Sequence, residues 1–306
     1  MERFDVVGLG YCAVDYLGIV PRYPGLDEKV RLTEFARQGG GLVATAMAAV
    51  GRLGGRTSYI GKVGDDDFGR FTIAELQKDG VDTTPVVIQP GASTQFAFIA
   101  VDQATGKRTI FWTTSGIMLE PEEIRREDVI AGKVLQVDAH YPLAAIRATA
   151  WANEAGIPVV MDAGTLREGS HELAERTDYL ITSALFAKQF TGEDDPEKAA
   201  RAMFTGRRKL SVVTMGDKGC VCVTEEGAFH QPAFEVEVVD TTGAGDVFHG
   251  AFSFGLAKGW PVREIIEFAS AVAALKCTKL GGRAGIPTYQ QTLDFIRDRI
   301  TSPGPR

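Results

Sequence analysis

Positive charge and long apolar runs are both scarce in this sequence. Its 306 residues carry 33 Lys and Arg against 40 Asp and Glu, which gives a net charge of −7. This balance provides no overall basic field to attract nucleic-acid phosphates. No apolar run has the length of a membrane span or of a secretory signal. We therefore expect neither nucleic acid nor a membrane as a partner, and we expect a cytoplasmic protein.

Cysteine is also rare, and its placement excludes a disulfide scaffold. The four cysteines are Cys12, Cys220, Cys222 and Cys277, and they lack the paired spacing of a metal site. Cys220 and Cys222 alternate as two residues on one strand face, so reduced thiols in a core are expected. Hydrophobic residues at 44% and charged residues at 24% are typical of a soluble globular chain.

The sequence does contain a regular alternation of short β-rich runs with longer helical patterns. Thr57–Ile60, Tyr179–Thr182 and Leu210–Thr214 are such runs, whereas Ala244–Lys258 and Val262–Lys276 have helical periodicity. Strands that alternate with helices form a mainly parallel sheet with helices on both faces. The pattern predicts an α/β fold with a Rossmann-like, doubly wound sheet.

Two stretches interrupt this alternation with strands that have no helix between them. They are Val14–Arg37 and Ser93–Thr113, and each lies beside a glycine-rich connection. We interpret residues 14–37 and 93–113 as a small β-sheet lid over a site. Residues 1–13, 38–92 and 114–306 would then form the α/β core that binds nucleotide and substrate.

A glycine-rich turn near the start of the chain matches a relaxed dinucleotide-binding fingerprint. Gly8-Leu9-Gly10-Tyr11-Cys12-Ala13 follows a strand, but Val14–Pro21 favours a strand or loop where the fingerprint needs a helix. We interpret it as a strand that ends in a glycine turn.

The segment Val236–Phe252 is more informative, because it reads as strand, turn and helix. Gly243, Ala244 and Gly245 are small enough for an oxyanion to approach their N–H groups, and a helix that begins there adds a positive dipole end. Asp246 follows in the first turn, where a carboxylate can accept a hydroxyl proton or simply cap the helix. Three small residues before it favour the functional interpretation, an anion hole for a phosphoryl group.

Two motifs together resemble a known family. Asp240-Thr241-Thr242-Gly243-Ala244-Gly245-Asp246 is similar to the second signature of the ribokinase, or PfkB, family of carbohydrate kinases. The first signature is similar to Gly39–Gly54 with Ile60–Gly69. The resemblance spans nearly the whole chain and implies a Rossmann-like core with a β-sheet lid. It also implies transfer from ATP, with Mg²⁺, to a sugar or nucleoside, and a homodimer formed through the lid.

The resemblance also implies roles for individual residues. Asp246 would be the catalytic base, with Gly243, Ala244 and Gly245 as the anion hole. The acceptor hydroxyls would contact these positions: Asp15, Gly40, Gly41, Asp138 and Thr45. Thr45 stands where the family often has Asn, and its hydroxyl reaches less far.

On the nucleotide side, the resemblance implies that Thr214, Gly216 and Gly219 contact ATP. The stretch Ala273–Gly282, with Ala273 and Gly282 at its ends, would form the wall of the adenine pocket. Many family members hold a monovalent cation, often K⁺, near the positions of Asp240 and Thr242 and the Gly281-Gly282 turn. K⁺ is therefore a further expected cofactor.

One family motif is incomplete here. The Asn-x-x-Glu motif that organises water around Mg²⁺ aligns with Ser183-Ala184-Leu185-Phe186, so the acidic residue is missing. Either the phosphates of the nucleotide and water hold Mg²⁺, or another carboxylate such as Asp162 substitutes.

The acceptor itself stays open. The tail Ala273–Pro287 and the Gly-Gly-Gly-x-x-Ala-Thr-Ala form of the first signature are similar to the branch containing sulfofructose kinase. A sulfonated or phosphorylated sugar would need cations, and Lys29 is the lid cation we select, beside Arg31, Lys107 and Arg108. Aromatic lid residues could serve a nucleoside kinase instead, and the missing acid leaves room for a catalytically silent sensor. We assign His249 no role, and Arg283 could contact phosphate or form a surface ion pair.

Overall fold

The computed structural model describes residues 4–113 and 115–301. The other residues of the predicted core, 1–3, 114 and 302–306, lie outside the described residues. Within the described residues the main sheet has nine strands, and seven consecutive ones pair in parallel. From one edge to the other the strands are β15 (Gly227–Gln231), β14 (Cys220–Thr224), β13 (Leu210–Thr214), β12 (Tyr179–Ser183), β11 (Val159–Ala163), β10 (Gly132–Asp138), β1 (Phe4–Leu9), β4 (Thr57–Ile60) and β6 (Val81–Asp82). Only β14 and β15 are joined in antiparallel fashion.

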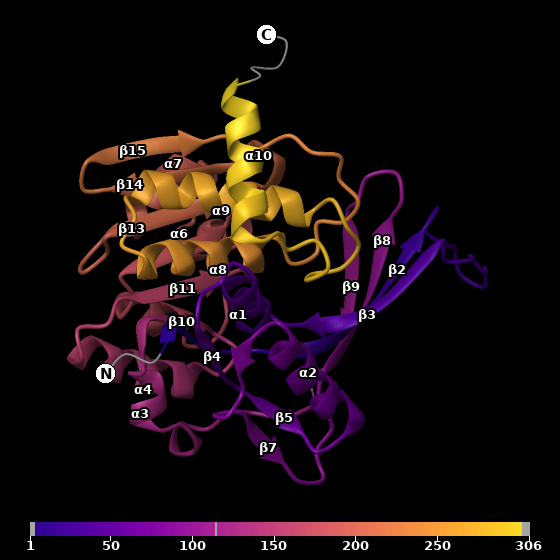
Figure 1. The fold of residues 1–306 in the computed structure, drawn as a ribbon, viewed down its shortest axis with the longest axis horizontal. Coiled ribbons are helices and arrows are strands. Elements are labelled where there is room, and N and C mark those ends of the chain that lie inside the picture. Colours follow the sequence, from indigo (N-terminus) through magenta and orange to yellow (C-terminus); the bar gives the residue numbers. More distant parts are fainter. Residues whose placement is uncertain (1–3, 114, 302–306) are drawn as a thin grey trace.

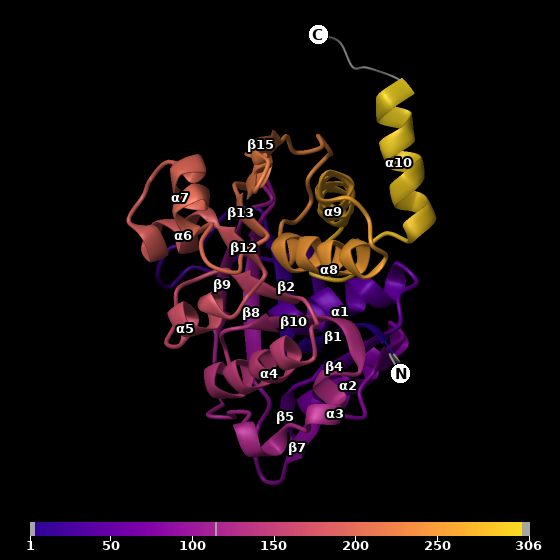
Figure 2. The same cartoon turned by 90° about the vertical axis from the view of Figure 1, so that its left-hand side faces the viewer.

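Helices cover both faces of this sheet (Figures 1 and 2). Helices α1 (Leu42–Arg52), α8 (Ala244–Ala257) and α9 (Val262–Lys276) pack on one face. The other face is covered by helices α4 (Pro142–Glu154), α5 (Ser170–Glu175), α6 (Ala184–Thr191) and α7 (Pro196–Met203). Two hydrophobic cores result, one on each side of the sheet. The predicted doubly wound α/β fold is confirmed.

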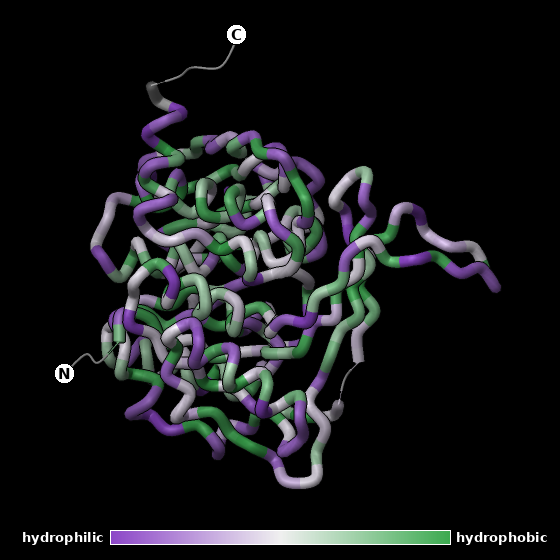
Figure 3. The backbone as a smooth tube through the Cα atoms, turned by 45° about the vertical axis from the view of Figure 1, so that its right-hand side comes forward, coloured by the Kyte–Doolittle hydropathy of each residue, from purple (hydrophilic) through white to green (hydrophobic). Residues whose placement is uncertain are grey.

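The remaining elements lie at the periphery. Helix α2 (Asp67–Lys78) contacts β6, and helix α10 (Tyr289–Thr301) contacts α9. A two-stranded sheet joins β5 (Lys62–Gly64) to β7 (Val87–Gln89). Helix α3 (Arg126–Val129) and the 3₁₀ turns Pro121–Glu123 and Gly216–Lys218 complete the list. Figure 3 shows the hydrophobic segments inside and hydrophilic segments concentrated outside.

A second sheet of four strands stands beside the core, with strand order β3, β2, β8 and β9. The strands are β2 (Ala13–Val20), β3 (Glu34–Gly40), β8 (Phe96–Asp102) and β9 (Arg108–Trp112). Strands β2 and β8 are parallel, and the two outer pairs are antiparallel. The long connection between β2 and β3 extends away from the core (Figure 1). We call these four strands the side sheet.

The predicted strands Thr57–Ile60 and Leu210–Thr214 agree with the structure residue for residue. The strand predicted at the start of Val236–Phe252 is wrong, because the structure has no strand between β15 and α8. Its backbone instead turns toward α9, where the N–H groups of Val239 and Asp240 donate to the carbonyl of Cys277 at 2.9 and 3.1 Å. The four cysteines are free and buried. Within the described residues, no helix combines the length and apolarity needed to cross a bilayer.

Candidate active site

A pocket of about 490 Å³ lies where the carboxyl ends of the core strands face the side sheet. Asp138 ends β10, Ser183 ends β12 and Thr214 ends β13, and each lines it. Ligands bind at this edge in open α/β sheets because the loops there diverge. From the side sheet, Asp15 and Trp112 complete the opposite wall. The pocket therefore brings polar groups from both parts of the molecule together.

The turn before α8 exposes backbone donors to this pocket. Gly243 has a φ of 73°, a left-handed conformation that glycine adopts without strain. A Cβ there would lie 2.9 Å from the Cα of Gly282, so two turns pack closely at this point. Among the described residues, the N–H groups of Gly245 and Asp246 donate to no backbone carbonyl, although both residues line the pocket. Free amides at a helix N-terminus favour an anion.

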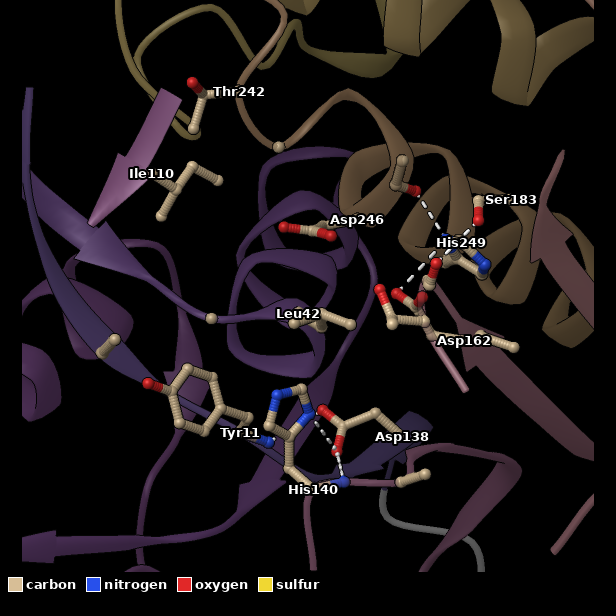
Figure 4. Close-up of a pocket in the computed structure, with 18 of the residues that line it drawn as sticks. Tyr11, Leu42, Ile110, Asp138, His140, Asp162, Ser183, Thr242, Asp246 and His249 are labelled. Carbon is tan, nitrogen blue, oxygen red and sulfur yellow. Dashed lines mark hydrogen bonds and ion pairs between the residues drawn. The ribbon is translucent and has the colours of Figure 1, made fainter. Parts of the chain in front are cut away.

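Asp246 lies beside these amides with its carboxylate directed into the pocket (Figure 4). Burial raises its pKa to about 7, and the negative charge of Asp162 acts in the same direction. His249 and Arg108 oppose that shift. The side chain accepts no hydrogen bond from any described residue, so its oxygens are available to a ligand.

Asp138, in the same pocket, has the opposite environment. Its carboxylate accepts hydrogen bonds from the N–H groups of Tyr11 and His140, both at 2.9 Å, and lies 3.3 Å from Nδ1 of His140. Burial alone would raise the pKa of this carboxyl, but His140 and the two N–H donors outweigh it and lower the pKa. Asp138 is thus an ionised side chain with fixed partners. The rings of Tyr11 and His140 stack with centroids 4.4 Å apart.

Two further pocket residues lie near Asp246: His249, to which the sequence assigns no role, and Asp162, which it offers only as a substitute carboxylate for Mg²⁺. The ring of His249 lies between the carbonyl of Gly245, 2.6 Å from Nδ1, and the carbonyl of Ile181, 3.2 Å from Nε2. Oδ2 of Asp162 lies 3.3 Å from Nδ1 of His249 and, in the described part of the chain, accepts no hydrogen bond. Burial raises the pKa of Asp162 well above its usual value. A lone histidine in a helix gave no sequence signal for the contact between His249 and Asp162.

The glycines before α1 allow the close approach of Asp15. A Cβ on Gly40 would lie 2.2 Å from Oδ2 of Asp15, so a larger residue would displace this carboxylate. Gly41 caps α1 with a φ of 91° and lines the pocket. Burial raises the pKa of Asp15 to about 7, against the positive charge of Arg283. Asp15 and Gly41 therefore lie in the pocket wall, with Gly40 directly behind.

Two predicted acceptor residues are placed elsewhere. Thr45 is buried in α1, where its hydroxyl is 3.4 Å from Nε of Arg283, and it does not line the pocket. Lys29 is exposed on the connection between β2 and β3, outside the pocket lining. Arg283 forms no surface ion pair, since it is 2% exposed and donates from Nη2 to the carbonyl of Gly40 at 3.2 Å.

On the predicted nucleotide side, only Thr214 lines this pocket. Gly216 begins a 3₁₀ turn at the end of β13, and Gly219 follows it with a φ of 81°. Ala273 is half-buried in the last turns of α9, and Gly282 packs on Gly243. Of these four positions outside the pocket lining, Gly282 is the one that contacts the amide-rich turn.

Cations also line the pocket. Nη1 of Arg108 donates to the hydroxyl of Thr241 at 3.0 Å, next to the amide-rich turn. The guanidinium of Arg167 lies 5.9 Å from the ring centre of Trp112. Arg167 had no sequence signal, because it stands in an irregular loop after β11. The pocket thus combines four carboxylates with two guanidinium groups.

At the position predicted for a monovalent cation, Asp240 forms hydrogen bonds with protein donors instead. The Asp240 carboxylate accepts from N and Oγ1 of Thr242, at 2.8 and 2.7 Å, and from N of Gly281 at 2.7 Å. Nζ of Lys276 donates to the backbone carbonyl of Asp240 at 2.8 Å. Among the described residues no cluster of three His, Cys, Asp or Glu side chains could hold a metal ion.

A doubly wound α/β core and a pocket with a carboxylate beside free helix amides together define a phosphotransferase of the ribokinase-like class. The chain belongs to the pfkB family carbohydrate kinases, whose family model matches residues 3–289. It is a carbohydrate kinase that transfers phosphate from ATP to a sugar.

Particular relatives agree with this assignment. The chain is similar to fructokinase-1 of Zea mays, 32% identical, over 95% of this chain and 97% of that protein. It is similar to the ribokinase structure from Thermotoga maritima, 27% identical, with a TM-score of 0.83 over 96% of this chain and 99% of that one. The fold is shared with the ribokinase of Arabidopsis thaliana solved with ribose and ATP, 24% identical, with a TM-score of 0.84 over 96% and 99% of the two chains.

Proposed function

We propose that this kinase moves the γ-phosphoryl of ATP to a sugar hydroxyl held in the pocket, with Asp246 as general base. The observation that carries the proposal is the Asp246 carboxylate, which lies beside the free amides of the α8 N-terminus without a hydrogen-bond partner of its own in the described chain. A base needs an open oxygen and a pKa near working pH, and Asp246 has a pKa of about 7.

The turn Gly243–Gly245 serves as the anion hole. Charge on the transferring phosphoryl group would be stabilised by the N–H groups of Gly245 and Asp246 together with the α8 dipole. His249, which contacts the carbonyl of Gly245, would hold this turn in place. Arg108 reaches Thr241 at the same end and adds positive charge. Phosphoryl transfer depends chiefly on such positioning and charge stabilisation.

The acceptor would bind at the opposite end of the pocket. Asp15 and Asp138 offer carboxylate oxygens to sugar hydroxyls, and the backbone at Gly41 allows close approach. The side sheet would act as a lid that excludes water and limits ATP hydrolysis. In this proposal the acceptor hydroxyl would lie between Asp246 and the amides.

Mg²⁺ accompanies ATP in the structure of a fold relative from E. coli, which is 23% identical. Bound with ATP, Mg²⁺ would neutralise phosphate charge. Oδ2 of Asp162, buried and without a hydrogen bond from the described residues, fits a role toward this ion, directly or through water. Phe186 occupies the position of the missing acid and stacks on Phe190 with ring centres 5.4 Å apart.

A ketohexose is the first acceptor to test, because the curated relatives include fructokinases. A phosphorylated or sulfonated sugar is the second candidate, because Arg108 and Arg167 both line the pocket. A nucleoside is a third arm of the test, since Trp112 is a lid aromatic that faces the pocket.

The experiment is an assay of ADP release with Mg-ATP over fructose, other neutral sugars, sugar phosphates, sulfofructose and nucleosides. One acceptor should give turnover that Asp246→Asn removes while ATP binding, measured by calorimetry, is retained. Near-normal kcat in this variant would disprove the base assignment. ATP binding without turnover on any acceptor would favour a sensor.

We also propose a homodimer formed through the side sheet. Ile99 and Trp112 face the pocket, so strand alternation places Phe98 and Phe111 on the opposite face. These two rings are exposed, as is Phe35 beside them. A second copy of the chain would cover this apolar face. Sedimentation equilibrium should give a dimer that Phe98→Glu converts to a monomer, and a monomeric parent protein would refute the proposal.

A further inference from the structure

Lys276 is a buried lysine at the end of α9. It is 0% exposed, whereas lysine is almost never fully buried unless it is paired. Its Nζ donates to the backbone carbonyl of Asp240 at 2.8 Å. No described carboxylate forms an ion pair with it. Burying a charge in this position costs free energy unless neighbouring groups compensate it.

The surroundings of Lys276 are the two turns that support the anion hole. The first turn, Asp240–Gly243, leads into α8, and the second is the Gly281-Gly282 turn that packs on Gly243. Asp240 joins them, because its carboxylate accepts from Thr242 in one turn and from Gly281 in the other. The ammonium therefore lies directly behind the turn that presents amides to the pocket.

The electrostatic environment of the ammonium is set by few groups. Burial lowers the pKa of Lys276, and the negative charge of Asp240 opposes this effect. Cys277 and Asp246 act in the same direction as Asp240, whereas Arg108 acts against them. Lys276 thus adds a positive charge at the base of a site that must stabilise phosphoryl oxygens.

A monovalent cation fits this position poorly. K⁺ would need oxygen ligands, but both carboxylate oxygens of Asp240 already accept N–H or O–H donors. The carbonyl of Asp240 faces the lysine ammonium instead. Ammonium and K⁺ carry the same charge, and both bind carbonyl oxygens.

We infer that the ammonium of Lys276 takes the place of the monovalent cation behind the anion hole, so that this kinase works without K⁺. Lys276 is then a positioning residue, since it contacts the Asp240 turn and no reacting group. The inference rests on the proposed anion hole at Gly243–Gly245. It predicts that catalysis is indifferent to the counter-ion in solution.

The first test compares salts at constant ionic strength. The parent enzyme should have the same kcat within about twofold in potassium, sodium and choline chloride. A difference of this size is what changes confined to the protein surface produce. Activation by K⁺ well beyond twofold over choline would overturn the inference.

The second test removes the ammonium with two matched variants. Lys276→Ala should lose roughly 10–100-fold in kcat in choline chloride, the usual effect of losing an outer-sphere partner. K⁺ or NH₄⁺ should restore much of that loss by entering the vacated space. Lys276→Met fills the same space without charge, so it should be equally impaired and should not be rescued. Full activity of Lys276→Ala in choline would refute the inference.

A third measurement does not depend on turnover. The melting temperature of Lys276→Ala should rise when K⁺ replaces choline, whereas that of the parent and of Lys276→Met should not. If Lys276→Ala does not fold in choline, folding restored by K⁺ supports the inference and no restoration contradicts it. Asp246→Asn separates this result from the proposed function, since it should be inactive in every salt yet melt like the parent.

Discussion

The two ends of the pocket hold the same type of residue in opposite electrostatic states. At the end of β10, Asp138 accepts two N–H hydrogen bonds and lies beside His140, which lowers its pKa. At the start of α8, Asp246 accepts no hydrogen bond from the described residues, and its pKa is raised to about 7. Both side chains are enclosed by the same pocket, so burial alone does not separate them.

The difference shows how local partners divide the roles of two acids. A carboxylate with fixed donors stays ionised and can hold a hydroxyl by its remaining lone pairs, but it has little tendency to take up a proton. A carboxylate without donors can exchange a proton near neutral pH. The comparison predicts that chemistry depends on Asp246 and acceptor binding on Asp138.

The largest expected effect is that of Asp246→Asn. The amide cannot accept the hydroxyl proton, so kcat should fall by about 10²–10⁴-fold, the usual contribution of a general base. The KM for the sugar should change much less, because the variant keeps the shape of the pocket. Steady-state kinetics with the identified acceptor measure both constants, and a loss confined to KM would reverse the comparison.

Gly245→Ala tests the amides separately from the acid. The added Cβ meets no atom within 4 Å and replaces a helical glycine, so the protein should be as stable as the parent or more so. The methyl group nevertheless enters the pocket next to the free amides, and kcat should drop roughly 10–100-fold. Thermal melting and kinetics report the two effects. Gly25→Ala, on the exposed connection between β2 and β3, is the control and should alter neither.

The pH profile sharpens the contrast. With a pKa of about 7, Asp246 is protonated at lower pH and cannot act as a base, so kcat/KM at pH 6 should be about tenfold below its plateau. Asp138, with its lowered pKa, stays ionised over this range. Asp138→Asn should therefore keep the acidic limb, with a midpoint slightly below that of the parent, because the charge of Asp138 raises the pKa of Asp246. Asp15 also has a pKa of about 7, so Asp15→Asn is the control variant. If this variant loses the acidic limb, the titration belongs to Asp15 and not to Asp246.

Asp138→Asn should act mainly on acceptor binding. The substitution weakens the hydrogen bonds that hold the Tyr11 and His140 backbone, so the KM for the sugar should rise several-fold with a smaller change in kcat. The KM for ATP serves as the internal control and should be unchanged. A fall in kcat as large as that of Asp246→Asn would remove the distinction between the two acids.

The smallest expected effect is that of Lys29→Ala, outside both ends of the pocket. Lys29 is exposed and does not line the pocket, so both kinetic constants should stay within about twofold of the parent values. A large rise in the KM for the acceptor would instead indicate that this lysine contacts the substrate. The contact would form either in its own subunit after the side sheet closes or in the pocket of a partner subunit.

The sequence was sufficient to predict most of the fold. Short apolar strands such as Leu210–Thr214 and amphipathic helices such as Val262–Lys276 have local periodicity that tertiary contacts do not override. The strand predicted at the start of Val236–Phe252 failed because alternation of valines indicates a strand only where a neighbouring strand is available, and here the backbone bonds to the end of α9.

The candidate site was less predictable where it depends on packing between distant segments. Asp246 and its glycines are contiguous, and they are found together in the pocket region. Thr45 lies behind the wall because Arg283, 238 residues further along the chain, fills the space beside it. Likewise nothing local distinguishes His249 from a core histidine until β11 brings Asp162 to 3.3 Å.

The connections of the side sheet limit how it can move. The chain passes between this sheet and the core at 10–12, at 40–41, before β8 and after β9. A flap attached by two neighbouring segments can swing freely, whereas a sheet attached at four crossings can pivot only together with the backbone at those crossings. Tyr11 lies in the first crossing, and its N–H donates to Asp138. Any such pivot would therefore shift Asp138 at the acceptor end of the pocket.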